Sequence, residues 1–304
     1  MNNKKLKMGF VIDPLSNFDP DRETTLLMMR EAQARGHSLF VFTLDHLCYR
    51  HPVLQAHATE IKTLKKGISP FYRAVQHSIE DLSSFDVIFL RKDPPFDLPY
   101  LHHLYLLQSL KGKVFMMNEP EGILKVAEKI YPLQFPDFIP STCITQNLEE
   151  ARSFFHQQRR GVVLKPIDSS GGRGIFSLKK GDSNFKVAFE QLSQNQTQFV
   201  ICQEYLPQVR IGDKRVVLLD GKILGYFLRV PKKGEHRANL HSGGLLKACS
   251  LSVKEKKLAE KVGETLKKEG LTFVGLDLIG EKLTEINVTS PMGLNEINQT
   301  QSLH

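Results

Sequence analysis

Apolar and polar residues alternate along the chain in two different patterns, which divide it near residue 120. Before this point, short apolar runs are separated by a segment of helical periodicity, residues 23–35, that ends at Gly36. A glycine directly after the last helical position is a common C-cap. The apolar runs expected to form strands are 6–12, 38–43, 86–91 and 113–117. Strands separated by helices are typical of a parallel sheet with covering helices, so the sequence predicts an α/β N-terminal domain with a Rossmann-like parallel sheet.

Polar residues follow two of these predicted strands. Asp13 comes after the first strand, and residues 91–96 come at the end of the third. Ligands of open parallel sheets bind beyond the carboxyl ends of the strands, so we expect ligand-binding residues here. No G-x-G-x-x-G follows the first strand, which argues against a dinucleotide site of that kind.

After residue 120 the pattern changes to antiparallel signals. Apolar strand patterns cover 162–166, 198–203 and 216–230, the last with a turn at Asp220-Gly221. A long helix is predicted over 253–269 and a hairpin over 271–288. The sequence therefore predicts a second, α+β unit.

The predicted hairpin carries a candidate metal site. If Gly280, Glu281 and Lys282 form a three-residue loop, Asp277 lies opposite Glu285 on one face; a one-residue slip would separate them. Two facing carboxylates repel unless a cation lies between them, and with the Asn287 amide oxygen they form a set that suits Mg²⁺. The alternative is a solvent-exposed face with hydrated charges, and the apolar opposite face argues against it.

A candidate phosphate site lies at Lys165 and the loop that follows. A lysine at the end of an apolar strand is costly unless its charge has a partner. Gly171, Gly172 and Gly174 allow backbone N–H groups to converge on phosphate oxygens. The alternative is a plain glycine-rich turn next to a lysine that reaches solvent.

Two further segments are compatible with nucleotide chemistry. Residues 199–207 run from a strand into a turn and could present backbone groups to an adenine, although a strand that simply ends at proline explains them equally well. Arg215, Arg229 and Arg237 could bind phosphate or carboxylate, and the polar loop that contains Arg237 could close over a substrate. The alternative for each is an ordinary surface arginine.

Composition excludes several classes of protein. The 304 residues are 41% hydrophobic and 24% charged, which argues against a disordered chain. No apolar run approaches the roughly 20 residues that span a bilayer, so we expect no membrane association. The net charge of +8 comes from dispersed basic residues and by itself does not separate nucleic acid from small anions. The four cysteines form no C-x-x-C pair, so we expect reduced thiols and a cytoplasmic protein.

Several motifs together resemble a known family. They are Ile12-Asp13-Pro14, Arg91-Lys-Asp-Pro-Pro-Phe-Asp97, Leu164-Lys-Pro166, Gly221 through Arg229, and Phe273 through Pro291 with its Leu-Thr-Glu-Ile-Asn-Val-Thr-Ser-Pro segment. In this order, over nearly the whole chain, they are similar to bacterial glutathione synthetases of the ATP-grasp superfamily. The resemblance implies an N-terminal α/β domain, 1–124, and an ATP-grasp unit, 125–304. The unit has two lobes, about 125–202 and 203–304, with a lid loop at 231–249.

The resemblance also implies roles for single residues. Arg215 and Arg229 are expected to be catalytic. The expected ATP-binding residues are Lys129, Lys165, Gly171, Gly172, Gln203, Glu204, Tyr205, Leu206 and Asp213. The expected metal ligands are Asp277, Glu285 and Asn287, and the expected peptide-binding residues are Arg237, Asn239 and Ser290.

The activity implied by the resemblance is an ATP- and Mg²⁺-dependent ligation, with Mn²⁺ as an alternative ion. ATP phosphorylates γ-glutamylcysteine, and glycine attacks the acyl phosphate to give glutathione. The implied partners are these small molecules and further copies of the chain, with no nucleic acid. Two alternatives are a related ligase with another amine or peptide substrate and a weakly active ATP-binding paralogue.

The chain departs from the family pattern near the substrate. Ser169 stands where a glycine is usual, Leu245 follows the Gly243-Gly244 pair in place of arginine, and Asn295 replaces an arginine before Glu296. Leu245 and Asn295 motivate the related ligase, and a sequence that stops at His304, short of the closing helix expected from the family, motivates the weakly active paralogue.

Overall fold

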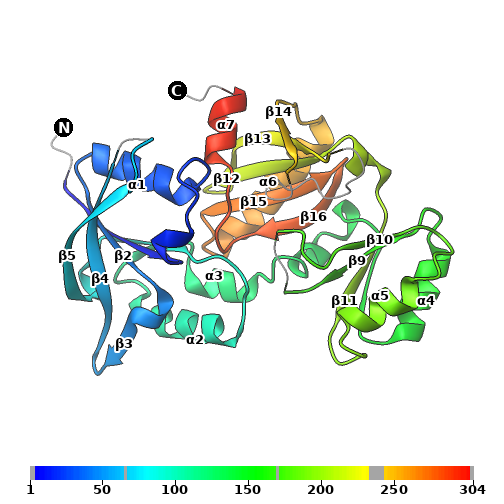
Figure 1. Cartoon of the computed structure of the whole chain (residues 1–304), viewed down its shortest axis with the longest axis horizontal. Coiled ribbons are helices and arrows are strands. Elements are labelled where there is room, and N and C mark those ends of the chain that lie inside the picture. The colour runs from blue at the N-terminus through cyan, green and yellow to red at the C-terminus, as the bar shows by residue number, and fades with distance from the viewer. Residues whose placement is uncertain (1–3, 65–66, 169–170, 233–242, 302–304) are drawn as a thin grey trace.

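Three sheets follow one another along the long axis of the molecule in the computed structural model (Figure 1). The structure describes residues 4–64, 67–168, 171–232 and 243–301. A seven-stranded sheet forms the N-terminal end, a five-stranded sheet the middle and a four-stranded sheet the far end. This arrangement confirms an α/β domain followed by a two-lobed α+β unit.

The N-terminal sheet has a parallel centre that agrees with the predicted strands. Its parallel strands are β1 (Lys7–Ile12), β2 (Ser38–Phe42), β6 (Val87–Arg91) and β7 (Phe115–Met117), in the order β2-β1-β6-β7. Helix α1 (Thr24–Ala34) packs Met29 and Ala32 against one face of this sheet. Helix α2 (Leu98–Leu107) packs Leu104 and Leu107 against the other face. The two faces are thus covered as the parallel pattern requires.

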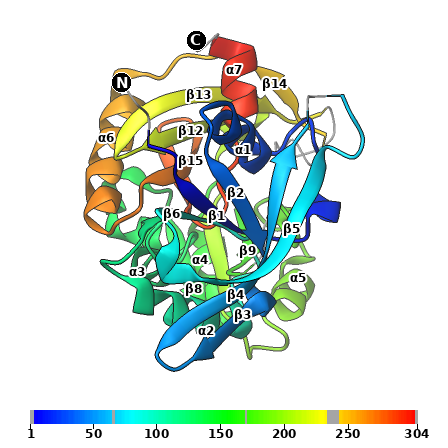
Figure 2. The same ribbon diagram turned by 90° about the vertical axis from the view of Figure 1, so that its left-hand side faces the viewer.

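Three antiparallel strands extend this sheet, and the sequence pattern did not predict them. They are β3 (Leu47–Arg50), β4 (Val53–Thr63) and β5 (Tyr72–Asp81), and Figure 2 shows β4 and β5 on the side facing the viewer. The buried face of β4 changes along its length, from Leu54, Ala56 and Ala58 to Ile61 and Thr63, across a register shift after Glu60. Strand β5 is largely exposed on both faces. Neither strand therefore shows a single sustained alternation, and the expectation of a purely parallel sheet was incomplete.

The four-stranded sheet is a lobe with its own core. Its strands are β8 (Thr142–Thr145), β9 (Val162–Pro166), β10 (Phe176–Leu178) and β11 (Val200–Glu204), all paired antiparallel in the order β10-β9-β11-β8. Helices α4 (Leu148–Gln157) and α5 (Phe185–Leu192) cover it, and Phe155 stacks on Phe185 with ring centroids 4.4 Å apart. The core of this lobe is separate from the other cores described.

The five-stranded sheet shares its core with the N-terminal domain. Its strands are β12 (Asp213–Leu219), β13 (Lys222–Val230), β14 (Leu245–Lys247), β15 (Phe273–Ile279) and β16 (Lys282–Asn287), in the order β14-β13-β12-β15-β16. Helix α6 (Val253–Lys268) agrees with the predicted helix and begins with a capping box between Ser252 and Glu255. The remaining helices are α3 (Pro120–Lys125) and α7 (Leu294–Gln301). One continuous cluster joins Leu258 and Leu276 of this sheet layer to Leu90 and Leu104 of the N-terminal domain.

Candidate active site

A cavity of about 480 Å³ lies where the three sheets meet. Strands β9 and β11 contribute from one side, and β12, β13, β15 and β16 contribute from the other. Loops of the N-terminal domain line one end. All the described residues to which the family resemblance gives a role line this cavity: Lys129, Lys165, Gly171, Gly172, Gln203, Glu204, Tyr205, Leu206, Asp213, Arg215, Arg229, Asp277, Glu285, Asn287 and Ser290. Of the positions expected beyond the N-terminal strands, Asp93 and Pro94 line it and Asp13 does not.

The hairpin of β15 and β16 places Asp277 opposite Glu285 by a different route from the one expected. The strands end at Ile279 and resume at Lys282, so the loop has two residues rather than three. A bulge between Asp277 and Leu278 then shifts the register by one residue. The bulge, not the loop length, therefore sets the pairing of the two carboxylates.

Asp277 is buried and bound by two arginines, which excludes a solvated hairpin face. Arg215 Nε donates to Asp277 Oδ1 at 2.5 Å and Nη2 to Oδ2 at 3.1 Å. Arg229 Nη2 lies 3.0 Å from Oδ1 of the same carboxylate. Burial alone would raise the pKa of Asp277, but Arg215 and Arg229 hold that pKa well below its usual range. Asp277 is therefore an anion in the folded protein.

Asp213 completes this network on β12. The Arg229 guanidinium donates to Asp213 Oδ1 through Nε, at 2.9 Å, and through Nη2. Burial raises the pKa of Asp213, while the Arg229 charge acts in the opposite direction. Arg215 and Arg229 are thus fixed, buried cations rather than surface arginines, and their forks point toward the cavity that they line.

Glu285 has a different environment from Asp277. Burial and the nearby Asp277 charge raise the pKa of Glu285 to about 7, although Lys129 and Lys165 oppose the shift. Lys129 Nζ lies 3.9 Å from Glu285 Oε1. A divalent cation between Glu285 and Asp277 would favour the ionised form of Glu285, so this carboxylate fits a metal ligand.

Asp277, Glu285 and Asn287 supply too few oxygen ligands to hold a hard cation without further oxygens from water or a bound ligand. Asn287 Nδ2 lies 3.3 Å from the Gly275 carbonyl and 3.4 Å from Asp277 Oδ2, which directs the amide group into the site. Among the described residues, no group of three His, Cys, Asp or Glu side chains gathers in a metal-binding arrangement. Two carboxylates and one amide oxygen suit an ion that keeps water and phosphate oxygens as its remaining ligands.

Two lysines face this hairpin from the other side of the cavity. Lys165 on β9 is buried, and its Nζ lies 3.5 Å from the Thr284 carbonyl of β16. Burial lowers the pKa of Lys165 to about 8, more than the Glu285 charge raises it. The Lys129 ammonium donates to the Ile167 carbonyl at 3.2 Å. A buried ammonium with only a distant carbonyl partner is well suited to an anionic ligand, and Lys165 does not reach bulk solvent as the alternative required.

The end of β11 forms the third wall. Gln203 is buried and its Nε2 donates to Thr142 Oγ1 of β8 at 2.9 Å. Glu204, Tyr205 and Leu206 follow before a short 3₁₀ turn at Pro207–Arg210. These residues line the cavity with β9, so the segment is more than a strand that ends at proline.

Some predicted residues lie outside the described part of the chain. These are Arg237, Asn239 and Ser169, so their predicted roles stay predictions. Of the other departures, Leu245 lies on β14 and is 53% exposed. Asn295 Nδ2 donates to the Arg22 carbonyl at 3.0 Å, which ties α7 to the N-terminal domain.

The structure adds cavity residues that the sequence did not single out. Glu128 lines the cavity, and its Oε1 accepts from Val288 N at 2.8 Å and from Thr289 N at 3.1 Å. From the N-terminal domain, Glu23 and Asp93 also line it. Only Asp93 lay in a region where the sequence predicted ligand residues. Glu128 directly precedes Lys129, which the resemblance marked as an ATP-binding residue. Neither residue lies at the end of a predicted strand, so the sequence pattern did not indicate that Glu128 lines a site.

The chemistry that this arrangement supports is transfer of a phosphoryl group. Fixed cations from three directions, a hard-cation site and a cavity between two lobes would bind a polyphosphate and stabilise charge on the transferring group. Among the described helices, none has the length and apolar character needed to span a bilayer.

Comparison with protein families gives two matches that together cover most of the chain. The prokaryotic glutathione synthetase N-terminal domain matches residues 6–123, and the prokaryotic glutathione synthetase ATP-grasp domain matches residues 128–302. The glutathione synthetase of Vibrio cholerae serotype O1 is 38% identical over 96% of this chain and 92% of its own length. That of Escherichia coli strain K12 is 37% identical, with the same shares covered.

Solved structures support the fold at lower identity. D-cycloserine synthetase DcsG aligns with a TM-score of 0.65 at 13% identity, over 96% of this chain and 93% of its own. The ATP-grasp ligase PsnB, complexed with a minimal precursor, aligns with a TM-score of 0.62 at 15% identity, over 98% and 95%. These similarities concern the fold alone.

Proposed function

The chain belongs to the prokaryotic glutathione synthetase family, and from this premise we propose that the cavity between its three sheets is the active site. The protein is an ATP-dependent ligase that joins γ-glutamylcysteine and glycine to form glutathione, ADP and phosphate. It uses a divalent metal ion with ATP. The roles of single residues below are our proposals, drawn from their positions in the cavity.

The phosphates of ATP bind between the two lobes. Lys165 and Lys129 hold them from the side of the four-stranded sheet, and the backbone at Gly171 and Gly172 adds N–H donors. The low pKa and the burial of Lys165 support this role, because an anionic ligand gives its ammonium a stronger partner than the Thr284 carbonyl at 3.5 Å. The nucleoside end lies against Gln203, Glu204, Tyr205 and Leu206, where carbonyl, carboxylate and apolar groups are close together.

The metal ion is Mg²⁺, held by Asp277, Glu285 and Asn287. Oxygen ligands of this kind suit Mg²⁺, which completes its shell with phosphate oxygens and water. When bound, it would neutralise charge on the phosphates. Because Asp277 already accepts from Arg215 and Arg229, it serves both as a metal ligand and as the anchor that orients these arginines.

Arg215 and Arg229 act on the transferring groups. A carboxylate oxygen of γ-glutamylcysteine attacks the γ-phosphorus of ATP, the bond to the ADP oxygen breaks, and an acyl phosphate forms. The glycine nitrogen then attacks the acyl carbon, and phosphate leaves. Both steps place negative charge on phosphoryl and acyl oxygens, which two pre-oriented guanidinium groups stabilise without rearrangement. Asp213 keeps Arg229 in this orientation.

The peptide lies at the other end of the cavity, with Ser290, Arg237 and Asn239 as its contacts and the loop at 231–249 as a lid that excludes water. We also propose domain limits of 1–124 and 125–304, a homo-oligomer, and a cytoplasmic location, in keeping with four free cysteines.

The observation that carries the site assignment is the position of Lys165 and Lys129 directly across from Asp277 and Glu285. The test is phosphate release from ATP with γ-glutamylcysteine, with and without glycine. Glycine-dependent release, with one glutathione formed per phosphate, is expected. Release only with a different amine, or nucleotide binding without release, would overturn the assignment of glycine as the acceptor.

A further inference from the structure

The N-terminal domain gives its part of the cavity lining an excess of negative charge. In the second unit, the cations of Lys129, Lys165, Arg215 and Arg229 line the cavity together with the carboxylates of Asp213, Asp277 and Glu285. The N-terminal domain instead contributes three carboxylates and one guanidinium: Asp19, Glu23, Asp93 and Arg22. ATP and its metal ion account for the charged groups of the second unit, but nothing in their chemistry calls for the carboxylates of the N-terminal domain.

Asp93 is held firmly in this part of the lining. Its backbone N–H donates to Asp13 Oδ2 at 2.9 Å, and Lys92 Nζ lies 3.0 Å from Asp13 Oδ1. Ser290, across the domain boundary, lies beside the Asp93 carboxylate, and its hydroxyl group opposes the rise in the pKa of Asp93. Burial raises the pKa of Asp93, and the nearby charges of Glu23 and Asp13 add to that shift. The site therefore gains if a cation binds next to Asp93.

Glu23 is the N-cap of α1 and approaches Asp93 from the neighbouring loop. Its Oε1 accepts from Thr25 N at 3.0 Å, which fixes the side chain at the start of the helix. A carboxylate accepts more than one hydrogen bond, so this cap leaves capacity for a ligand. Asp19, by contrast, accepts from Asp21 N at 3.1 Å and faces Arg22 at 3.9 Å, so its charge is already partly balanced.

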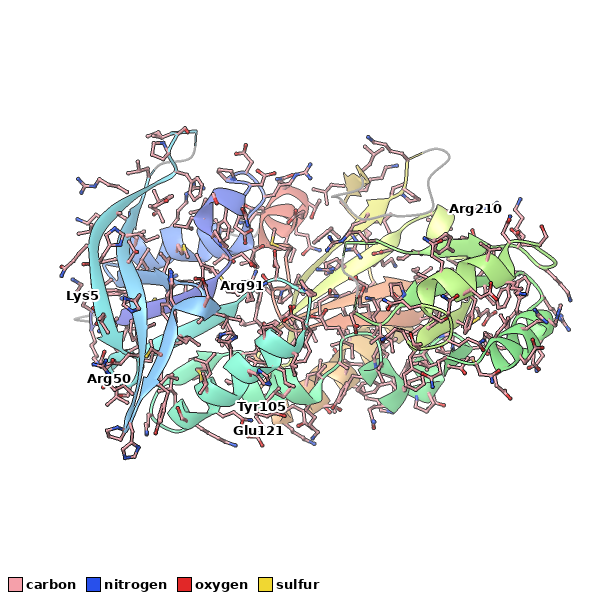
Figure 3. The ribbon with its side chains drawn as sticks, turned by 60° about the horizontal axis from the view of Figure 1, so that its bottom comes forward. Lys5, Arg50, Arg91, Tyr105, Glu121 and Arg210 are labelled. Carbon is pink, nitrogen blue, oxygen red and sulfur yellow. The ribbon has the colours of Figure 1, made fainter. Side chains whose placement is uncertain are left out.

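A buried guanidinium lies next to these two carboxylates. Arg91 is 3% exposed, and Figure 3 places it near the middle of the molecule, between the N-terminal sheet and the second unit. Its Nε donates to Thr25 Oγ1 at 3.0 Å, but within the described residues its Nη1 and Nη2 have no hydrogen-bond partner. Burial lowers the pKa of Arg91, and Glu23 and Asp93 oppose the shift. The positive charge of Arg91 acts on both carboxylates, and among the described residues its Nη1 and Nη2 atoms donate to neither of them.

This charge pattern is complementary to an ammonium group. Arg91 offsets one carboxylate of the Glu23 and Asp93 pair, and the other negative charge is left for a ligand. In γ-glutamylcysteine the peptide bond uses the side-chain carboxyl group, so the α-ammonium of the glutamyl residue stays free at the end farthest from the reacting carboxylate. A peptide whose carboxylate lies at Arg215 and Arg229 therefore directs this ammonium toward the N-terminal domain.

We propose that Asp93 and Glu23 bind the α-ammonium of the γ-glutamyl group, so that the N-terminal domain selects the peptide substrate. Arg91 and Asp13 are positioning residues, the first through its charge and the second through the Asp93 backbone. This inference rests on the proposed function, because it takes the reacting carboxylate to lie at the two arginines.

The test compares two substrates in variants that remove one carboxylate charge each. The substrates are γ-glutamylcysteine and glutarylcysteine, which differs only in that hydrogen replaces the amino group. The variants are Asp93→Asn and Glu23→Gln, and the matched control is Glu31→Gln, an exposed position on the same helix, α1. The measured quantity is the ratio of kcat/KM for the two substrates. This ratio is independent of the fraction of folded protein, so partial misfolding of a variant does not affect it.

We expect the wild-type protein and Glu31→Gln to prefer γ-glutamylcysteine by about 100-fold or more, since a site built around a polar group rejects an analogue that lacks it. Asp93→Asn and Glu23→Gln should each lower this preference about 10-fold, through a higher KM for the peptide and an unchanged KM for ATP. An unchanged preference in both variants would overturn the proposal. Absence of glycine-dependent turnover in the wild-type protein would instead refute the proposed function, so the two failures are distinguishable.

Discussion

The two sheets that face the cavity differ in whether their buried charged side chains have partners of opposite charge. On the five-stranded sheet, Arg215, Arg229, Asp213 and Asp277 are buried together and neutralise one another through direct hydrogen bonds. On the four-stranded sheet, Lys165 is buried with one carbonyl at 3.5 Å as its hydrogen-bond partner, and its pKa falls to about 8.

This difference separates what the protein needs to fold from what it needs to bind. The arginines are fixed before any ligand arrives because their counter-ions belong to the same sheet. Lys165 has only a carbonyl group as its hydrogen-bond partner, so we expect a bound phosphate to act as its counter-ion. The free energy lost by burying its charge is then compensated only when phosphate binds. On the proposed roles, the first arrangement orients the catalytic arginines before ligand binds, and the second lets ligand binding stabilise the protein.

The largest effect should follow from Glu285→Gln, which removes one charge from the proposed metal site and keeps the shape. We expect kcat/KM for ATP to fall about 10²- to 10³-fold, the range seen when one pre-oriented electrostatic group is lost. Folding should not suffer, because the raised pKa of Glu285 means that its ionised form is unfavourable in the ligand-free protein. Steady-state kinetics and urea denaturation of the ligand-free variant check both parts. Wild-type activity in this variant would remove Glu285 from the metal site.

Asp213→Asn should instead affect folding. It removes one of the two carboxylates bound by Arg229 and leaves a buried cation with Asp277 as its remaining anion. We expect the free energy of unfolding to fall by about 3 kcal/mol, as is typical when one partner of a buried ion pair is removed. The control is Asp220→Asn, whose ion pair with Lys267 is half exposed and worth less than about 1 kcal/mol. Equal unfolding free energies for the two variants would contradict a structural role for the network.

Lys165→Met should weaken ATP binding and at the same time stabilise the ligand-free protein. We expect a rise of about 10- to 100-fold in KM for ATP, together with a ligand-free protein at pH 7 that is more stable by on the order of 2 kcal/mol. The folded pKa of Lys165, about 8, lies below the ordinary value of 10.5, so burial of its charge costs most below pH 8. As pH rises from 8 toward 10.5, the folded lysine is neutral and the unfolded one still charged, so the wild type gains stability and the advantage of the variant shrinks. A variant that is less stable at pH 7 would show that the Thr284 carbonyl and the Glu285 charge already compensate the buried ammonium in the ligand-free protein.

The smallest effect should follow from a change next to Gln203, one of the residues proposed to contact the nucleoside. Thr142→Val removes the acceptor of the Gln203 amide and leaves the strand pairing of β8 and β11 intact. We expect KM for ATP to rise about 5-fold, in line with one hydrogen bond of about 1 kcal/mol. Thr145→Val, at the other end of β8, should leave KM unchanged. Similar KM values in both variants would mean that Gln203 does not depend on Thr142 for its position.

Local patterns in the sequence predicted the helices and strands whose buried positions recur at a constant spacing or form a continuous apolar run. The parallel strands of the N-terminal domain are continuous apolar runs because both faces are covered, and α6 shows both its apolar stripe and its cap residues. Strand β5 could not be predicted in the same way, because a strand exposed on both faces has no apolar alternation.

The candidate site could be predicted from the sequence where one motif carries several of its residues. Asp277, Glu285 and Asn287 lie within one hairpin, so their proximity depends on a single register. The bulge that sets this register has no mark in the sequence. Glu23 and Glu128 reach the cavity through packing between distant segments, which a single sequence does not encode in any local pattern. The proposed roles of Arg237 and Asn239 stay predictions.

Glu128 has a consequence for attempts to rearrange this protein. Its side chain and its carbonyl together accept four hydrogen bonds from residues 286–289, so the segment that joins the two halves of the chain is also a brace for the end of β16. A circular permutant or a split protein with its new ends at this junction would lose that brace at the same time as the covalent link. The exposed turn at 194–196 offers a safer place for new termini, since it belongs to a lobe that keeps its own core.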